Sequence, residues 1–252
     1  AGPDPVNADF QRPAFAAAGF SFAALVLALF LLKESLSEET RKRLAQQPPR
    51  TRIQLFRQAL SRPNVALLIG MSFLATFTFA GLEATFAMWS RRQFGWGPEQ
   101  NGYLFAFVGL LGAIVQGRMV GGLARRFGEA RLIVQGAAAL CTGVLLIPLA
   151  SNLPLLVVAI TIAAYGFSII SPSLNSLISL QVGDDEQGGV MGVTRSATTL
   201  ARVFGPAWAG LLFSVLGKDW PYFGGAAVMA IVVVVCFRAI PQLEHPKPPP
   251  AA

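Results

Sequence analysis

The stretch Gly117-Arg-Met-Val-Gly-Gly-Leu-Ala-Arg-Arg-Phe-Gly-Glu-Ala-Arg131 decides how the rest of the chain is arranged. It holds four arginines within fifteen residues, whereas the flanking apolar runs 103–116 and 132–150 carry no charge. Positively charged loops between membrane spans are retained on the cytoplasmic side of a bilayer. The stretch therefore predicts a basic cytoplasmic hairpin between two membrane-spanning helices.

The composition of the chain favours lipid as its solvent. Of its 252 residues, 54% are hydrophobic and only 13% are charged, and the mean hydropathy is +0.55. A soluble domain carries about 25% charged residues. The net charge of +7 comes from basic blocks between apolar runs, which is not the pattern of a nucleic-acid-binding face.

The chain lacks the motifs of an enzyme or a cofactor-binding protein. Gly121-Gly122 is not followed by Lys and Ser or Thr, as a nucleotide-binding loop requires. The single His245 has no cysteine or second histidine near it, so we expect no metal site. Cys141 and Cys236 lie inside apolar runs and are interpreted as buried, unpaired thiols.

The sequence predicts an all-α integral membrane protein with seven spans. A helix needs roughly 20 mostly apolar residues to cross about 30 Å of hydrocarbon. Seven segments meet this rule, namely 14–32, 63–90, 102–124, 132–150, 153–182, 189–217 and 220–240.

Four regions follow from these spans. We expect an N-terminal segment with the first span (1–32), a basic linker (33–62), a six-helix bundle (63–240) and a Pro-rich tail (241–252). Within the linker, an apolar stripe favours a helix lying at the lipid interface. The stripe consists of Ile53, Leu55, Phe56 and Leu60.

The distribution of basic residues predicts the orientation. Fifteen Lys and Arg fall on the side of the 33–62 linker and the Arg118–Arg131 segment, and four fall on the other side. The N-terminus is then outside and the C-terminus cytoplasmic, in a cell membrane such as the bacterial inner membrane. A chain that starts outside with one isolated span is expected to be incomplete at its N-terminus.

An internal repeat relates the third span to the sixth. Glu99-Gln-Asn-Gly102 matches Glu186-Gln-Gly-Gly189 at a separation of 87 residues, and Gly117-xxx-Gly-Gly-Leu123 matches Gly205-xxx-Ala-Gly-Leu211 at 88. Because three helices separate the copies, they run in opposite directions, as in a three-plus-three inverted repeat. Ordinary helix starts and small-residue packing remain the alternative explanation.

These features together resemble the second half of a major facilitator superfamily transporter. Leu32-Lys-Glu-Ser-Leu36 is similar to the end of the sixth helix in twelve-helix drug–proton antiporters, and Gly121–Gly128 resembles the family's cytoplasmic loop motif. The residues that the motif match covers are Gly117, Gly121, Arg125, Arg126 and Gly128. Arg125 replaces the aspartate of the stronger copy, so an acidic gating contact is not carried over. By this resemblance, the helices that correspond to the family's first five are expected to be missing from this sequence.

Glu83 is the only acid inside a predicted span, and it shares a helix face with three hydroxyl groups. At 100° per residue, four side chains fall within about 40° of one another. These are Ser72, Thr76, Glu83 and Ser90. A carboxylate in lipid is costly, so Glu83 is predicted to contact a substrate cation or carry a proton. An ion pair with Arg91 or Arg92 is the alternative.

Two further spans hold candidate pathway residues. Arg202 lies at the middle of the sixth span, near Gly205-Pro206, which we expect to kink the helix. Arg195 is expected to extend to the cytoplasmic surface. The fifth span carries a polar stripe that lines a cavity or, equally, bonds a neighbouring helix. It comprises Thr161, Tyr165, Ser168, Pro172, Asn175 and Ser179.

The resemblance implies a secondary active transporter that exports a small molecule by proton-coupled alternating access, and its likeness to drug–proton antiporters implies a drug-like substrate. Its partners would be that substrate, a proton gradient, the lipid bilayer and a separate N-terminal half, with no cofactor and no nucleic acid. A non-transporting membrane module, or a truncated relic that needs a partner chain, is the alternative.

Overall fold

The computed structural model describes residues 11–31 and 52–244, and the chain divides into two compact units. The first unit comprises residues 1–49, and its described part is one helix, α1 (Gln11–Leu31). Ala14–Leu31 is long and apolar enough to cross a membrane, which agrees with the first predicted span. The Leu32–Leu36 motif and most of the predicted linker and tail lie outside the described residues.

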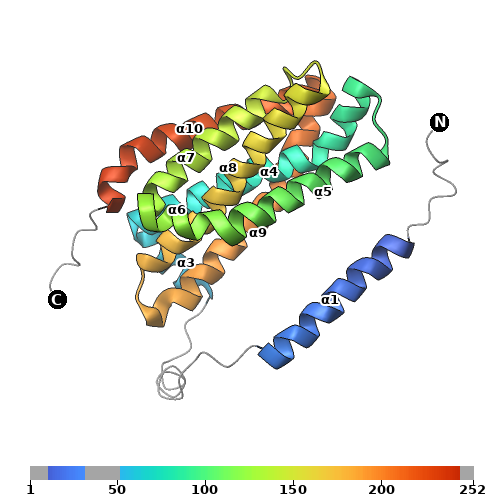
Figure 1. Ribbon diagram of the computed structural model, residues 1–252. Coiled ribbons are helices and arrows are strands. Elements are labelled where there is room, and N and C mark those ends of the chain that lie inside the picture. Colours follow the sequence, from blue (N-terminus) through green and yellow to red (C-terminus); the bar gives the residue numbers. More distant parts are fainter. Residues whose placement is uncertain (1–10, 32–51, 245–252) are drawn as a thin grey trace. The chain divides into compact units, whose positions relative to one another are not determined.

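The second unit is a bundle of long helices, shown side by side in Figure 1. No strand occurs in the ranges 11–31 and 52–244, so the described chain is all-α. The helices of the bundle are α3 (Arg52–Ser61), α4 (Pro63–Phe94), α5 (Pro98–Ile114), the π-helix η2 (Val115–Met119), α6 (Val120–Phe127), α7 (Glu129–Leu146), α8 (Leu153–Leu180), α9 (Asp184–Val215) and α10 (Trp220–Glu244).

Six helical segments in the described residues are long and apolar enough to span a membrane, where the sequence predicted seven. The helix that fails this test is α9, although its 32 residues are ample for a crossing. Polar residues, among them Arg195 in its first half and Arg202 just past its midpoint, lower its apolar character. A helix that lines a polar cavity can cross a bilayer without being apolar on every face.

The turn of the predicted basic hairpin is shorter than the sequence indicated. Helical backbone continues from Pro98 through α5, η2 and α6 to Phe127, and only Gly128 separates it from α7. Gly128 has φ +81°, a conformation that glycine adopts without steric cost. Four of the five predicted loop residues therefore lie on a helix, and the turn is a single glycine.

Helix packing in the bundle follows the predicted inverted repeat. The first triplet is α4, α5–α6 and α7, and the second is α8, α9 and α10. The first helix of each triplet contacts the second of the other, giving the pairs α4–α9 and α8–α5. The first also contacts the other triplet's third helix, as α4–α10 and α8–α7, while α7 meets α10. These partners interchange when the triplets are exchanged, as a two-fold repeat requires.

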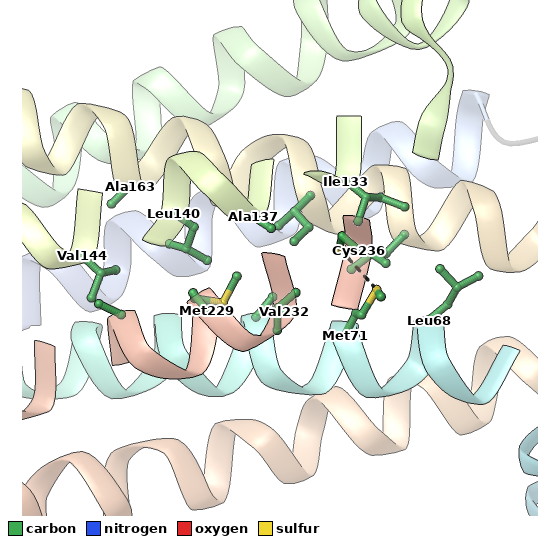
Figure 2. Packing of buried hydrophobic residues seen from close by; sticks show 14 of the residues in the cluster. Leu68, Met71, Ile133, Ala137, Leu140, Val144, Ala163, Met229, Val232 and Cys236 are labelled. Atoms are coloured by element: carbon green, nitrogen blue, oxygen red, sulfur yellow. Dashed lines mark hydrogen bonds between the residues drawn. The ribbon is translucent and has the colours of Figure 1, made fainter. Parts of the chain in front are cut away.

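The buried core lies where α4, α7, α8 and α10 meet. Figure 2 shows apolar side chains from these helices interleaved along the bundle, among them Leu140, Val144 and Met229. Cys236 is buried with its Sγ 3.8 Å from the Met71 Sδ. Both cysteines are free, as predicted. In lipid such packing stabilises helix association mainly through dispersion.

Glycines bring two helix pairs into backbone contact. A Cβ atom added to Gly143 on α7 would lie 2.3 Å from the Ala163 backbone nitrogen on α8. One added to Gly205 on α9 would lie 2.5 Å from the Phe77 carbonyl oxygen on α4. Only glycine fits at such distances, so these residues set the spacing of α7–α8 and α4–α9.

The glycines of the third span do not share this role. A Cβ added to Gly109, Gly117 or Gly121 would meet nothing within 4 Å, so they do not bring this span close to another helix of the described bundle. Gly112 alone faces a neighbour, with the Ser168 Oγ 3.4 Å from the added Cβ. The two copies of the sequence repeat therefore differ in packing: Gly205 is buried against α4, whereas the matching Gly117 is exposed.

Helix α3 is attached to the start of α9. The Arg62 guanidinium lies 2.7 Å from one Glu186 carboxylate oxygen, and the Gln58 amide donates to the other at 2.6 Å. Leu55 packs against Gly189. Three members of the predicted interfacial stripe, Ile53, Phe56 and Leu60, are exposed. Leu55 therefore belongs to the bundle rather than to the exposed face.

We expect Gly143→Ala to lower the free energy of unfolding by about 1–3 kcal/mol, because the new methyl group overlaps the α8 backbone. Gly210→Ala is the matched control, since its Cβ meets nothing within 4 Å and alanine is the better helix former. Thermal unfolding of the chain in detergent micelles, followed by circular dichroism, measures both. Equal stability of the two variants would contradict the packing.

Candidate functional site

A mostly apolar cavity of about 410 Å³ lies between α4, α5 and α8. We call it the Glu83 cavity, because Glu83 is the only ionisable residue in its lining. Its walls are formed by Phe79, Leu82, Glu83, Phe86, Leu104, Phe105, Val108, Gly109, Ile147, Ile160, Ala163 and Ala164. A large apolar pocket with one acid suits an apolar solute with a basic or protonatable group.

The Glu83 carboxylate has no hydrogen bond or ion pair within residues 52–244, and the residue is exposed. The alternative ion pair with Arg91 or Arg92 is not formed there. The Arg92 guanidinium instead lies over the Phe213 ring, 4.6 Å from its centroid. Glu83 is therefore available to a ligand or a proton.

A second, polar cavity of about 110 Å³ lies between α4, α8 and α9, and we call it the Arg202 cavity. It brings together four residues that the sequence singled out, namely Ser72, Thr76, Asn175 and Arg202. Its lining also includes Ala75, Phe167, Ser171, Leu174, Thr194, Arg195 and Thr198. Arg195, predicted to extend to the surface, is exposed and also contributes to this wall.

The threonines of α9 that line this cavity were not predicted from the sequence. Thr194, Thr198 and Arg202 are spaced by four residues, so they follow one face of the helix. The Thr194 hydroxyl donates to the Val190 carbonyl at 2.9 Å, and that of Thr198 to the Thr194 carbonyl at 3.2 Å. This periodicity was the signal available in the sequence.

Two stacked rings stand between the cavities. Phe79 lines the Glu83 cavity and Phe167 lines the Arg202 cavity, and their rings lie 4.0 Å apart at an interplanar angle of 4°. Glu83 and Arg202 therefore line different cavities, although the sequence placed them in one pathway.

Tyr165 and Ser168 line neither cavity. The Tyr165 hydroxyl accepts a hydrogen bond from the Gln135 amide of α7 at 2.9 Å. Ser168 is buried opposite Gly112 of α5. The polar stripe of α8 thus divides, with Asn175 in a cavity and Tyr165 bonding a neighbouring helix.

The other motif residues lie outside the two cavities. Arg125 and Arg126 are exposed on α6, and the Arg126 guanidinium lies 5.2 Å from the centroid of the Phe127 ring. Pro172 and Pro206 lie inside α8 and α9, which remain helical on both sides of each proline. No group of three or more His, Cys, Asp or Glu that could hold a metal occurs in the described ranges.

The model of the Major Facilitator Superfamily matches residues 6–150 and 119–252, which together cover nearly the whole chain. The chain belongs to this superfamily. It is therefore a multi-pass membrane protein of a family of transporters, not enzymes, whose substrates are small molecules. This confirms the resemblance seen in the sequence.

Curated relatives agree on the family and differ in length from this chain. Multidrug resistance protein 2 of Bacillus subtilis (strain 168) is 27% identical over 88% of this chain and 55% of its own length. Tetracycline resistance protein, class C, of Escherichia coli is 29% identical over 91% of this chain and 57% of its own. The chain spans about half the length of the curated relatives it matches.

A solved structure shows the same fold. The crystal structure of the human organic anion transporter MFSD10 (TETRAN) superposes with a TM-score of 0.65 at 25% sequence identity. The match covers 74% of this chain and 46% of that one. The bundle therefore has the architecture of about half of a major facilitator transporter.

Ser90, the last member of the α4 stripe, has a structural partner. Its hydroxyl donates to the Asn101 side-chain oxygen at 2.8 Å, and both residues are buried. We expect Ser90→Ala to lower the free energy of unfolding by about 1–2 kcal/mol, because Asn101 loses its donor. A thermal melt compares it with Ser214→Ala, an exposed control on α9. Equal melting temperatures would show that the bond contributes nothing.

Proposed function

We propose that this chain forms one half of a secondary active transporter that exports a small, apolar molecule in exchange for protons. The observation that carries the proposal is Glu83, an unpaired carboxylate in the wall of a cavity of about 410 Å³ that is otherwise apolar. An ionisable group at membrane depth is retained at a cost, which favours a role in the transport path.

The carboxylate offers a mechanism of exchange. When ionised, Glu83 attracts the basic group of a solute that fills the apolar walls, and when protonated it releases that solute. Proton binding and substrate binding then compete for one site, so a proton gradient drives export. Alternating access of the site requires a second bundle that rocks against this one.

The relatives support a drug-like substrate and a second half. Two of them bear names that denote multidrug resistance and tetracycline resistance, and each is nearly twice as long as the matched region. We propose that a further set of helices completes the transporter. Within this proposal the chain lies in a cell membrane with its C-terminus and its basic α6 segment in the cytoplasm.

We expect Glu83→Gln to abolish proton-driven uptake of the cationic dye ethidium into inverted membrane vesicles that contain the complete transporter. The amide cannot ionise, so the proton no longer competes with the dye. Glu99→Gln is the matched control, because Glu99 is exposed at the start of α5 and lines neither cavity. Unchanged, pH-dependent uptake by Glu83→Gln would remove Glu83 from the proton path.

The need for a second half is tested with this chain alone. Purified and reconstituted into vesicles with an imposed proton gradient, it should show no ethidium transport above that of protein-free vesicles, because one bundle cannot alternate access. Proton-driven transport by the isolated chain would contradict the proposal that a partner half is required.

A further inference from the structure

The Arg202 cavity carries positive charge that its own wall does not balance. Its lining contains Arg195 and Arg202 but no Asp or Glu. Neither guanidinium forms an ion pair within residues 52–244. Because an uncompensated charge at membrane depth is costly, such a site favours an anionic occupant.

Further hydrogen-bond donors in the same cavity are unused. The Thr76 hydroxyl and the Asn175 amide make no hydrogen bond in the described bundle. Together with the guanidiniums they supply donors from three helices, α4, α8 and α9. Charge-assisted hydrogen bonds to arginine are about twice as strong as neutral ones, and a planar carboxylate fits the guanidinium in a bidentate manner.

The two arginines cannot hold one carboxylate together. They are seven residues apart on one face of α9, which separates their Cα atoms by about 10 Å. Arg202 lies nearer the middle of the helix and, unlike Arg195, lies two turns beyond Thr194 on the same face as Thr198, so it is the stronger candidate for the contact. Phe167 supplies an aromatic wall for the rest of a small solute.

We propose that the Arg202 cavity is a subsite for a small organic carboxylate, held by the Arg202 guanidinium with Thr76 and Asn175 as further donors. The proposal rests on the proposed transport function and names a second substrate group for it. The transported molecule then presents an acidic group here, on the other side of the Phe79–Phe167 stack from Glu83.

Saturation-transfer NMR with the purified chain in detergent micelles measures the binding of benzoate and of benzamide, its neutral isostere. Benzoate should bind at least about tenfold more tightly than benzamide. Arg202→Gln should weaken benzoate binding at least about tenfold, whereas Arg202→Lys should weaken it less because the charge remains. Arg92→Gln is the matched control, since Arg92 lies over Phe213 and outside the cavity, and it should leave benzoate binding unchanged.

Three outcomes would overturn the subsite. The first is that benzoate and benzamide bind equally, or that benzoate binds equally to the wild type and to Arg202→Gln. The melting temperature of each variant shows that it is folded. The second is complete displacement of benzoate by phosphatidylglycerol added to the micelles, which would assign the arginine to a lipid phosphate. The third is loss of benzoate binding in the complete transporter, which would show that an acidic residue of the other half occupies the site.

The subsite and the transport function fail separately. Loss of the benzoate preference leaves the Glu83-dependent uptake of ethidium untouched. Conversely, if Glu83→Gln leaves ethidium uptake unchanged, the proposed proton exchange is refuted. The dependence of benzoate binding on Arg202 can still be measured in this chain.

Discussion

The rest of the structure depends on the direct contact of helix backbones at glycine. At Gly143 on α7, the backbone of α8 lies where a side chain would be, 2.3 Å from the position of a Cβ atom. At Gly205 on α9, the backbone of α4 does the same at 2.5 Å. In lipid the hydrophobic effect does not press helices together, so this close approach and the dispersion it permits determine how the bundle assembles. Larger residues at these positions would separate the pairs that surround both cavities.

Matching glycines in the two copies of the repeat have different surroundings, so the repeat is not symmetric in its packing. The matching Gly117 has open space around it and lies in a π-helical turn, whereas Gly205 is buried against α4. As a result α9 lies close along α4, and its polar face joins that of α8 around the Arg202 cavity. The third span stays more loosely attached and leaves room for the larger Glu83 cavity beside α4.

Much of the fold was predictable because membrane helices obey a simple length and polarity rule. Six predicted spans correspond to helices that are apolar enough to cross, and the inverted repeat agrees with the helix pairs in contact. The errors have physical causes. Hydropathy does not detect where a helix ends when its last turns are basic, so the predicted span ended at Ala124, whereas the helix continues to Phe127. Sequence spacing places residues on one face of one helix, but it does not show which neighbour that face meets. For this reason Tyr165 and Ser168 were assigned to the same pathway as Asn175.

By itself the sequence determined that the chain is an all-helical membrane protein with an inverted repeat, because span length, charge distribution and repeat spacing are properties of the linear chain. It also identified Glu83 and Arg202 as costly charges within spans. Only the tertiary structure decided that these charges lie in different cavities, since the stack of Phe79 on Phe167 joins residues 88 positions apart in the sequence. Only the tertiary structure also decided that both charges are unpaired, because that depends on which side chains of the neighbouring helices lie near them.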